Sequence, residues 1–138
     1  MKLILAGRNM PASFKKYEMN GVVCAGEVAD ATEFIADKKI LVVPLQAGSG
    51  IRIKIMEAIA AEKLVISTAI GMQGINDAID GVHFLLAEKA EDFIRQIKWA
   101  LANKDKAMEI AKNGAALIKE KYDQKKIMYE LVQRINLL

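Results

Sequence analysis

A chain of 138 residues, 53% hydrophobic and 27% charged, fits one domain with a sizeable core and is not an intrinsically disordered protein. The net charge of +3 is weak and the lysines are spread over the whole chain, so no basic stripe indicates a nucleic-acid partner. The apolar runs are far shorter than the ~20 residues that span a membrane. Residues 1–7 are too short for the apolar region and cleavage site of a signal peptide.

The single cysteine, Cys24, lies in an apolar run and excludes a disulfide framework or a cysteine-based metal cluster. We expect a small buried side chain there, and from this cysteine usage we infer a cytoplasmic location. The sole histidine, His83, has no serine or cysteine constellation beside it, so we interpret it as structural or as a residue at the rim of a site.

Short apolar runs alternate with amphipathic stretches in the first part of the chain. Runs rich in β-branched residues predict strands at residues 2–6, 22–25, 39–45, 64–68 and 82–87. Helices are expected at residues 11–18, 30–38 and 51–62, the second of them opening at Asp30 with capping-box spacing.

These strands show little polar alternation, which is typical of strands buried on both faces. Helical connections between them predict parallel βαβ units. The expected fold class is therefore α/β, with a doubly wound parallel sheet.

After Ala87 the pattern changes to a helical C-terminal segment, with apolar stripes at spacings of three and four. Core packing is the expected role of each stripe, although the third also suits a terminal helix that docks on a second domain or chain. The stripes are Ala90, Phe93, Ile94, Ile97 and Leu101; Ala107, Ala111, Ala115, Ile118 and Tyr122; and Ile127, Met128, Leu131, Val132, Ile135 and Leu138.

Residues 43–58 carry the chemistry, because they lead from a strand end through Gly48-Ser49-Gly50 to a helix N-terminus. In open α/β sheets ligands bind outside the carboxyl ends of the strands, and a helix N-terminus attracts phosphate. Glycines let the backbone approach a ligand, and Arg52 and Lys54 add positive charge. The opposite face of the helix, with Ile51, Ile55, Ala58 and Ile59, is expected to pack on the sheet.

Two simpler interpretations remain open at this point. The Gly-Ser-Gly segment also suits an ordinary tight turn. Lys54 and Glu57, three residues apart, also suit a surface pair worth a few tenths of a kcal/mol. A carboxylate at Glu57 accepts two hydrogen bonds from adjacent hydroxyls, as a ribose would offer.

Residues 48–60, together with residues 64–68 and 71–75, closely resemble the donor-binding domain of retaining GT-B glycosyltransferases of the group 1, or family 4, type. Residues 5–9 and 23–30 resemble earlier landmarks of that domain, in the right order. The resemblance implies a Rossmann-like sheet that is truncated at its N-terminus, because the family's opening strand and helix, with a basic pair for the diphosphate, have no counterpart here. The first and third strands then either pair directly, giving the order 2-1-3-4-5, or flank a gap that a second chain fills.

The resemblance also implies a donor site for a nucleotide-diphosphate sugar, with no metal ion and no other cofactor. Glu57 matches the second glutamate of the family's Glu-x7-Glu motif and would hold the ribose, while Ser49 stands at the first glutamate's position. Gly50 and Ile51 match backbone that faces the phosphates, and Val28 matches the position that reads the base. The full set of expected donor-binding residues is Gly7, Arg8, Val28, Gly48, Ser49, Gly50, Ile51, Lys54 and Glu57, and no catalytic residue is assigned.

By the same resemblance, residues 1–122 form the nucleotide-sugar-binding domain, and residues 123–138 form a helix that packs on a missing N-terminal acceptor domain or on a partner chain, a second copy included. The activity implied is glycosyl transfer of the hexosyltransferase type, with this fragment inactive alone. Polysaccharide or glycolipid assembly, in the cytoplasm or at the inner membrane surface, is the family's common setting.

Rival classes fit less well. A nicotinamide-binding module typically has Gly-x-Gly-x-x-Gly after the first strand, where this chain has Gly7-Arg8-Asn9-Met10-Pro11. A phosphoryl-receiver domain needs acidic residues where Gly7-Arg8 and Leu45-Gln46 stand, and no P-loop is present. A non-catalytic α/β nucleotide-binding or interaction module stays as the alternative.

Overall fold

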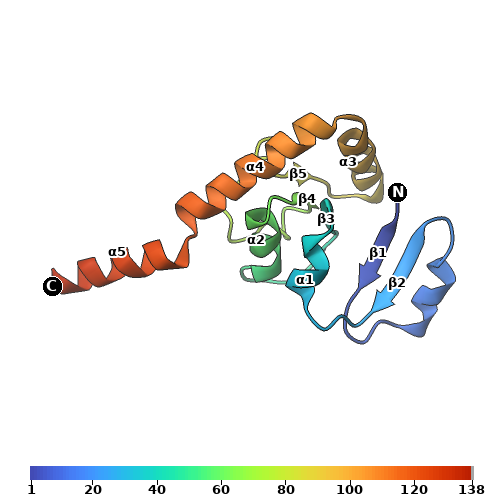
Figure 1. Cartoon of the computed structure of the whole chain (residues 1–138), viewed down its shortest axis with the longest axis horizontal. Helices are drawn as coiled ribbons and strands as arrows, with labels where there is room; N and C mark the ends of the chain where they lie inside the picture. The colour runs from blue at the N-terminus through green and yellow to red at the C-terminus, as the bar shows by residue number, and fades with distance from the viewer. Residues whose placement is uncertain (138) are drawn as a thin grey trace. The chain divides into compact units, whose positions relative to one another are not determined.

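A computed structural model describes residues 1–137 of the chain. The chain divides into two compact units, Met1–Phe34 and Ile35–Leu138. The first unit carries two strands, and the second carries three strands and most of the helices (Figure 1).

In the first unit, β1 (Leu3–Ala6) and β2 (Val22–Gly26) form a parallel two-stranded sheet. The helix η1 (Ala12–Tyr17) connects them. Both predicted strands are confirmed, and the helix expected between them has the tighter 3-10 geometry. Cys24, expected to be buried, is only half-buried in this two-stranded sheet, and its thiol donates to the carbonyl oxygen of Phe14 at 3.4 Å.

The helix α1 (Ala31–Ala36) begins where the capping pattern predicts. The carboxylate of Asp30 accepts hydrogen bonds from the backbone N–H groups of Thr32 at 2.7 Å and Glu33 at 3.1 Å. These contacts satisfy donors that the first turn of a helix leaves without intrahelical partners.

The second unit is built on a parallel sheet in the order β3 (Ile40–Val43), β4 (Leu64–Ser67) and β5 (Leu85–Leu86). Among the described residues, β1 pairs with β2, and β3 pairs with β4. The expected pairing of the first strand with the third would join the two units and stays a prediction. The α/β class with parallel strands is confirmed.

The central strand β4 is covered on both faces, as its apolar sequence predicts. Val65 packs into one core cluster with residues of α2 (Ile53–Ala60), whereas Ile66 packs into a second cluster with residues of α3 (Ala90–Ala102) and α4 (Lys104–Lys121). α4 reaches both clusters, because Ile118 near its C-terminal end belongs to the first. This two-sided cover is the doubly wound arrangement.

The strand β5 is shorter than the predicted residues 82–87. The residues before it form a tight turn, in which Gly81 takes a φ of +75°. In the same turn, Nδ1 of His83 accepts a hydrogen bond from the N–H of Ile79 at 3.0 Å. The side chain of His83 is thereby used to hold a turn, which agrees with its structural interpretation.

A carboxylate also fixes the start of α3. The backbone N–H of Lys89, the Arg95 guanidinium and the N–H of Glu88 all donate to Asp92 and hold its pKa below the usual range. Because the pKa is lowered in the folded state, this contribution to stability is present above the ordinary aspartate pKa and is lost as the pH falls through the lowered value.

The C-terminal stripes differ in how deeply they are buried. The second stripe is core, since Ala107, Ala111 and Ile118 are buried on α4. The first stripe is only partly core. Phe93 and Ile97 pack against the second cluster, whereas Ile94 and Leu101 are exposed.

The third stripe lies on α5 (Gln124–Asn136), and core packing is wrong for it. Figure 1 shows α5 leading away from the β3–β4–β5 sheet, so no layer of the second unit covers it. Leu138 lies outside the described residues. We call the exposed set the α5 strip; its side chains are 46–56% exposed and are Ile127, Met128, Leu131, Val132 and Ile135.

Because the α5 strip adds little to the core of this chain, Leu131→Lys is expected to change the free energy of unfolding by less than about 0.5 kcal/mol. Urea denaturation measures it. The matched control is Gln133→Lys on the same helix, which is expected to behave identically. A loss of more than about 2 kcal/mol in Leu131→Lys alone would show that the strip is buried in this chain.

Candidate functional site

The expected site residues of the second unit lie where β3 ends. Residues 46–52, here called the motif loop, lead from β3 into α2. Residues 68–75, here called the second loop, follow β4. Because parallel strands end at the same edge of a sheet, the two loops emerge side by side, which is where ligands bind in this class of sheet.

Two glycines shape the motif loop. Gly48 has a φ of +122° and Gly50 a φ of +86°, values that side chains with a Cβ rarely adopt. A Cβ on Gly48 would also lie 2.3 Å from Nη2 of Arg52. Glycine at position 48 is therefore favoured by its backbone conformation, while the Arg52 guanidinium, at the end of a flexible side chain, could move aside for a Cβ.

Arg52 folds back over the loop that precedes it. Its Nη1 donates to the carbonyl oxygen of Ser49 at 3.1 Å. Its Nε is buried without a hydrogen-bond partner among the described residues. An unmet buried donor costs about 1–3 kcal/mol, more when the group is charged. A guanidinium in that state at a helix N-terminus suits an incoming anion.

The side chain of Ile51 does not pack on the sheet as expected. It is 58% exposed and lies against Gly74 of the second loop, where a Cβ would come within 2.5 Å of its Cγ1. The rest of that expected face is buried, namely Ile55, Ala58 and Ile59. Ile51 therefore joins the tips of the two loops.

Lys54 and Glu57 lie together on α2. The Lys54 Nζ donates to Oε2 of Glu57 at 2.8 Å, and both side chains are partly exposed. The i,i+3 pair is thus formed, within two turns of the motif loop. The carboxylate is partly exposed, and the ion pair itself is worth little at a surface.

The first unit brings its own expected residues together at the carboxyl ends of β1 and β2. The N–H of Gly7 donates to the carbonyl oxygen of Gly26 at 2.8 Å. Arg8 forms an exposed ion pair with Glu27, with Nε and Oε1 3.0 Å apart. Val28, two residues beyond β2, is half-buried.

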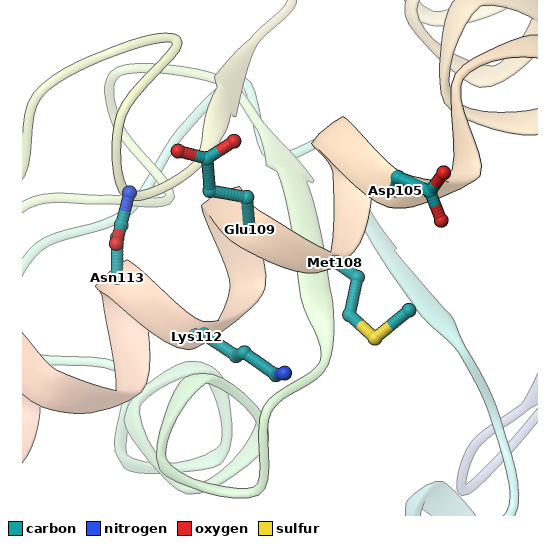
Figure 2. Close-up of a pocket in the computed structure, with 5 residues that line it drawn as sticks. All are labelled: Asp105, Met108, Glu109, Lys112 and Asn113. Carbon is teal, nitrogen blue, oxygen red and sulfur yellow. The ribbon is translucent and has the colours of Figure 1, made fainter.

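A shallow hollow of about 340 Å³ lies elsewhere, along the outer surface of α4. Its lining side chains all come from that helix and point in different directions (Figure 2). They are Asp105, Met108, Glu109, Lys112 and Asn113. Because a single helix surface provides no second wall, this hollow does not hold a ligand in a defined pose.

In residues 1–137, no group of three or more His, Cys, Asp or Glu side chains is arranged to hold a metal ion. No helix of the described part is both long and apolar enough to cross a membrane.

The sheet, covered on both faces, and the glycine loop at its carboxyl edge define a Rossmann-like domain. Residues 1–103 match the family model of the glycosyl transferases group 1, so the chain belongs to that family. A search of curated protein sequences found no significant match.

Solved structures share the fold at low sequence identity. HepE of Anabaena, crystallised in complex with UDP, matches 99% of this chain with a TM-score of 0.80 and 18% identity, over 41% of HepE. Its complex with UDP-glucose matches 99% with a TM-score of 0.79 and 19% identity, again over 41%. The C-terminal domain of LpcC, a glycosyl transferase group 1 protein of Francisella tularensis, matches 81% with a TM-score of 0.68 and 22% identity, over 60% of that chain. The chain thus spans less than half the length of HepE.

Proposed function

We propose that this chain binds a nucleotide-diphosphate sugar and serves as the donor-binding half of a retaining glycosyltransferase. The observation that carries the proposal is the motif loop, which turns at two positive-φ glycines from the end of β3 into α2. Such a loop presents backbone N–H groups and the positive end of a helix to phosphate. Family membership and the UDP complexes of HepE support the same ligand class.

In this proposal the motif loop and α2 contact different parts of the ligand. The backbone of Gly50 and Ile51 faces the diphosphate, with positive charge from Arg52 and Lys54 nearby. Glu57 holds the ribose hydroxyls through its carboxylate. Ser49, at the position of the family's first motif glutamate, offers a hydroxyl where a carboxylate would face the donor sugar.

The first unit has a proposed role of its own, which is to read the base of the nucleotide. Val28 contacts the base through its main chain, and Gly7 lets the backbone approach the donor. Arg8, already paired with Glu27 at the surface, supplies charge near that edge. No metal ion or other cofactor is part of the proposed site.

The acceptor is held by another domain in this proposal. The α5 strip is a solvent-exposed apolar surface, and such surfaces usually mark interfaces. An N-terminal acceptor domain is the proposed occupant, with a second copy as the alternative. Since transfer needs donor and acceptor oriented together, the chain alone is expected to transfer no hexose. A cytoplasmic enzyme of polysaccharide or glycolipid assembly, at the inner membrane surface, is the setting we propose.

A calorimetric screen of UDP-, GDP- and ADP-sugars against this chain tests the proposal. We expect one nucleotide class to bind at a single site. Affinity should be the same with EDTA as with Mg²⁺. Binding of none of the three classes, up to about 10 mM ligand, would favour a non-catalytic interaction module instead.

A further inference from the structure

We propose that Thr68 is a positioning residue for the donor site, and that its buried hydroxyl locks the motif loop to the second loop. The proposal rests on the function proposed above and assigns a role to a side chain that lies beneath the site instead of lining it. Thr68 is the first residue after β4 and is 1% exposed.

The hydroxyl of Thr68 makes one hydrogen bond to each side. Its Oγ1 donates to the carbonyl oxygen of Leu45, the residue before the motif loop, at 2.5 Å. The same oxygen accepts from the N–H of Gly71, in the second loop, at 3.1 Å. One buried side-chain atom therefore connects the base of both loops.

Both partners of this hydroxyl are backbone groups that lose a partner if the hydroxyl is removed. A buried backbone group without a partner costs free energy comparable to a lost hydrogen bond, so the loops would shift until water or another group satisfied it. Thr68→Val keeps the shape of the side chain and removes both bonds. The site would then lose its geometry before the core lost its packing.

Gly71 shows how closely the second loop is pressed on the strand ends. A Cβ at this position would lie 2.1 Å from Oγ of Ser67 and 3.1 Å from Cγ1 of Val43. The approach is possible because glycine lacks that atom. The N–H of Gly71 is consequently held within reach of the Thr68 hydroxyl.

The two loops also meet at their tips, where Ile51 lies on Gly74. The hydrogen bonds of Thr68 at the base and the Ile51–Gly74 contact at the tip together hold the two loops in a fixed arrangement, here called the loop platform. Binding sites gain affinity when the supporting side chains hold the contacting groups in place before the ligand arrives. Thr68 supplies the base link of that platform.

Ser67 offers a matched control, because it is a neighbouring hydroxyl that is 0% exposed. Its Oγ donates to the carbonyl oxygen of Thr68, at 3.0 Å, and so bonds within its own strand end. Ser67→Ala removes a buried hydroxyl without removing the bond to Leu45. It separates loss of any buried hydroxyl from loss of the link between the loops.

The test compares the chain with Thr68→Val, Thr68→Ser and Ser67→Ala, using UDP as the probe. Calorimetry measures UDP affinity, and NMR hydrogen exchange measures protection of the Gly71 amide without any ligand. We expect Thr68→Val to weaken UDP binding by about tenfold or more and to speed exchange at Gly71. Thr68→Ser should restore both, and Ser67→Ala, which keeps the bond to Leu45, should change both by much less than Thr68→Val does.

Gly74→Ala tests the tip link without entering the core, so the coupling stays testable if Thr68→Val does not fold. Alanine is opposed there both by the φ of +93° and by the contact of its Cβ with Ile51, and faster exchange in the motif loop with weaker UDP binding is expected. The proposal is overturned if the Gly71 amide of a folded Thr68→Val chain exchanges as slowly as before, or if Gly74→Ala leaves the motif loop unchanged. If the unaltered chain binds no UDP, the proposed function fails, while the exchange results still decide the coupling of the loops.

Discussion

Glu57→Gln is expected to weaken UDP binding by about 1.5–3 kcal/mol, which is roughly 10- to 150-fold in affinity. The substitution keeps the size of the side chain and its ability to accept a hydrogen bond, but removes the charge that strengthens bonds from ribose hydroxyls. Calorimetric titration of both chains with UDP measures the difference. The thermal midpoint should hardly move, because the Lys54–Glu57 pair is partly exposed and contributes little.

Two companion variants make the Glu57 result specific. Glu62→Gln removes an exposed carboxylate just beyond α2 and should leave UDP affinity unchanged. Ser49→Ala tests the position of the family's first motif glutamate and should affect a UDP-sugar more than UDP. Equal UDP affinity in Glu57→Gln and the unaltered chain would mean that Glu57 is half of a surface pair and nothing more.

Gly114→Ala is expected to destabilise the fold by about 1–3 kcal/mol, although alanine normally stabilises a helix interior relative to glycine by about 1 kcal/mol. Gly114 is buried on α4 where that helix crosses its neighbours. A Cβ there would lie 2.7 Å from the carbonyl oxygen of His83 and 2.9 Å from Cγ2 of Ile59. Overpacking against a backbone oxygen therefore outweighs helix propensity.

Urea denaturation of Gly114→Ala measures this change, with Asn113→Ala as its control. Asn113 is exposed on the same turn of α4, so alanine there should be neutral or slightly stabilising. A Gly114→Ala chain that is more stable than the unaltered one would show that α4 can move off the turn at His83 without loss.

Apolar periodicity was enough to predict the order of the elements, because β-branched runs and three-four spacing reflect burial directly. The strand predicted at residues 82–87 shows where this reasoning ends. Val82 and Phe84 look like strand residues, yet a positive φ at Gly81 and the side chain of His83 turn the chain before Leu85. Gly81 was the residue in the sequence that indicated a turn, and it was a better guide here than the apolar residues Val82 and Phe84.

Periodicity also does not say what covers an apolar face. The stripes on α4 and α5 look equally suited to a core, but Ile118 is buried and Leu131 is 47% exposed. The difference depends on whether another layer of the same chain reaches the helix. That information lies in the arrangement of the elements and not in the local sequence.

The candidate site could be located from sequence, because glycines between a strand and a helix have a direct physical meaning. The contacts that hold the loops of this site in place could not be predicted from the sequence. Thr68 reads as the end of an apolar strand, and only the structure shows its hydroxyl between Leu45 and Gly71. The unmet Nε of Arg52 is likewise invisible in the sequence, since it depends on how the side chain folds back on the loop.

Amide chemical-shift mapping of this chain on titration with UDP tests the donor-binding claim most directly. We predict saturable shifts centred on Gly48, Ser49, Gly50 and Ile51, with smaller ones along the second loop. The absence of shifts at about 10 mM UDP would contradict the claim. Saturable shifts confined to the hollow on α4, around Glu109 and Lys112, would contradict it equally, because they would place the nucleotide away from the motif loop.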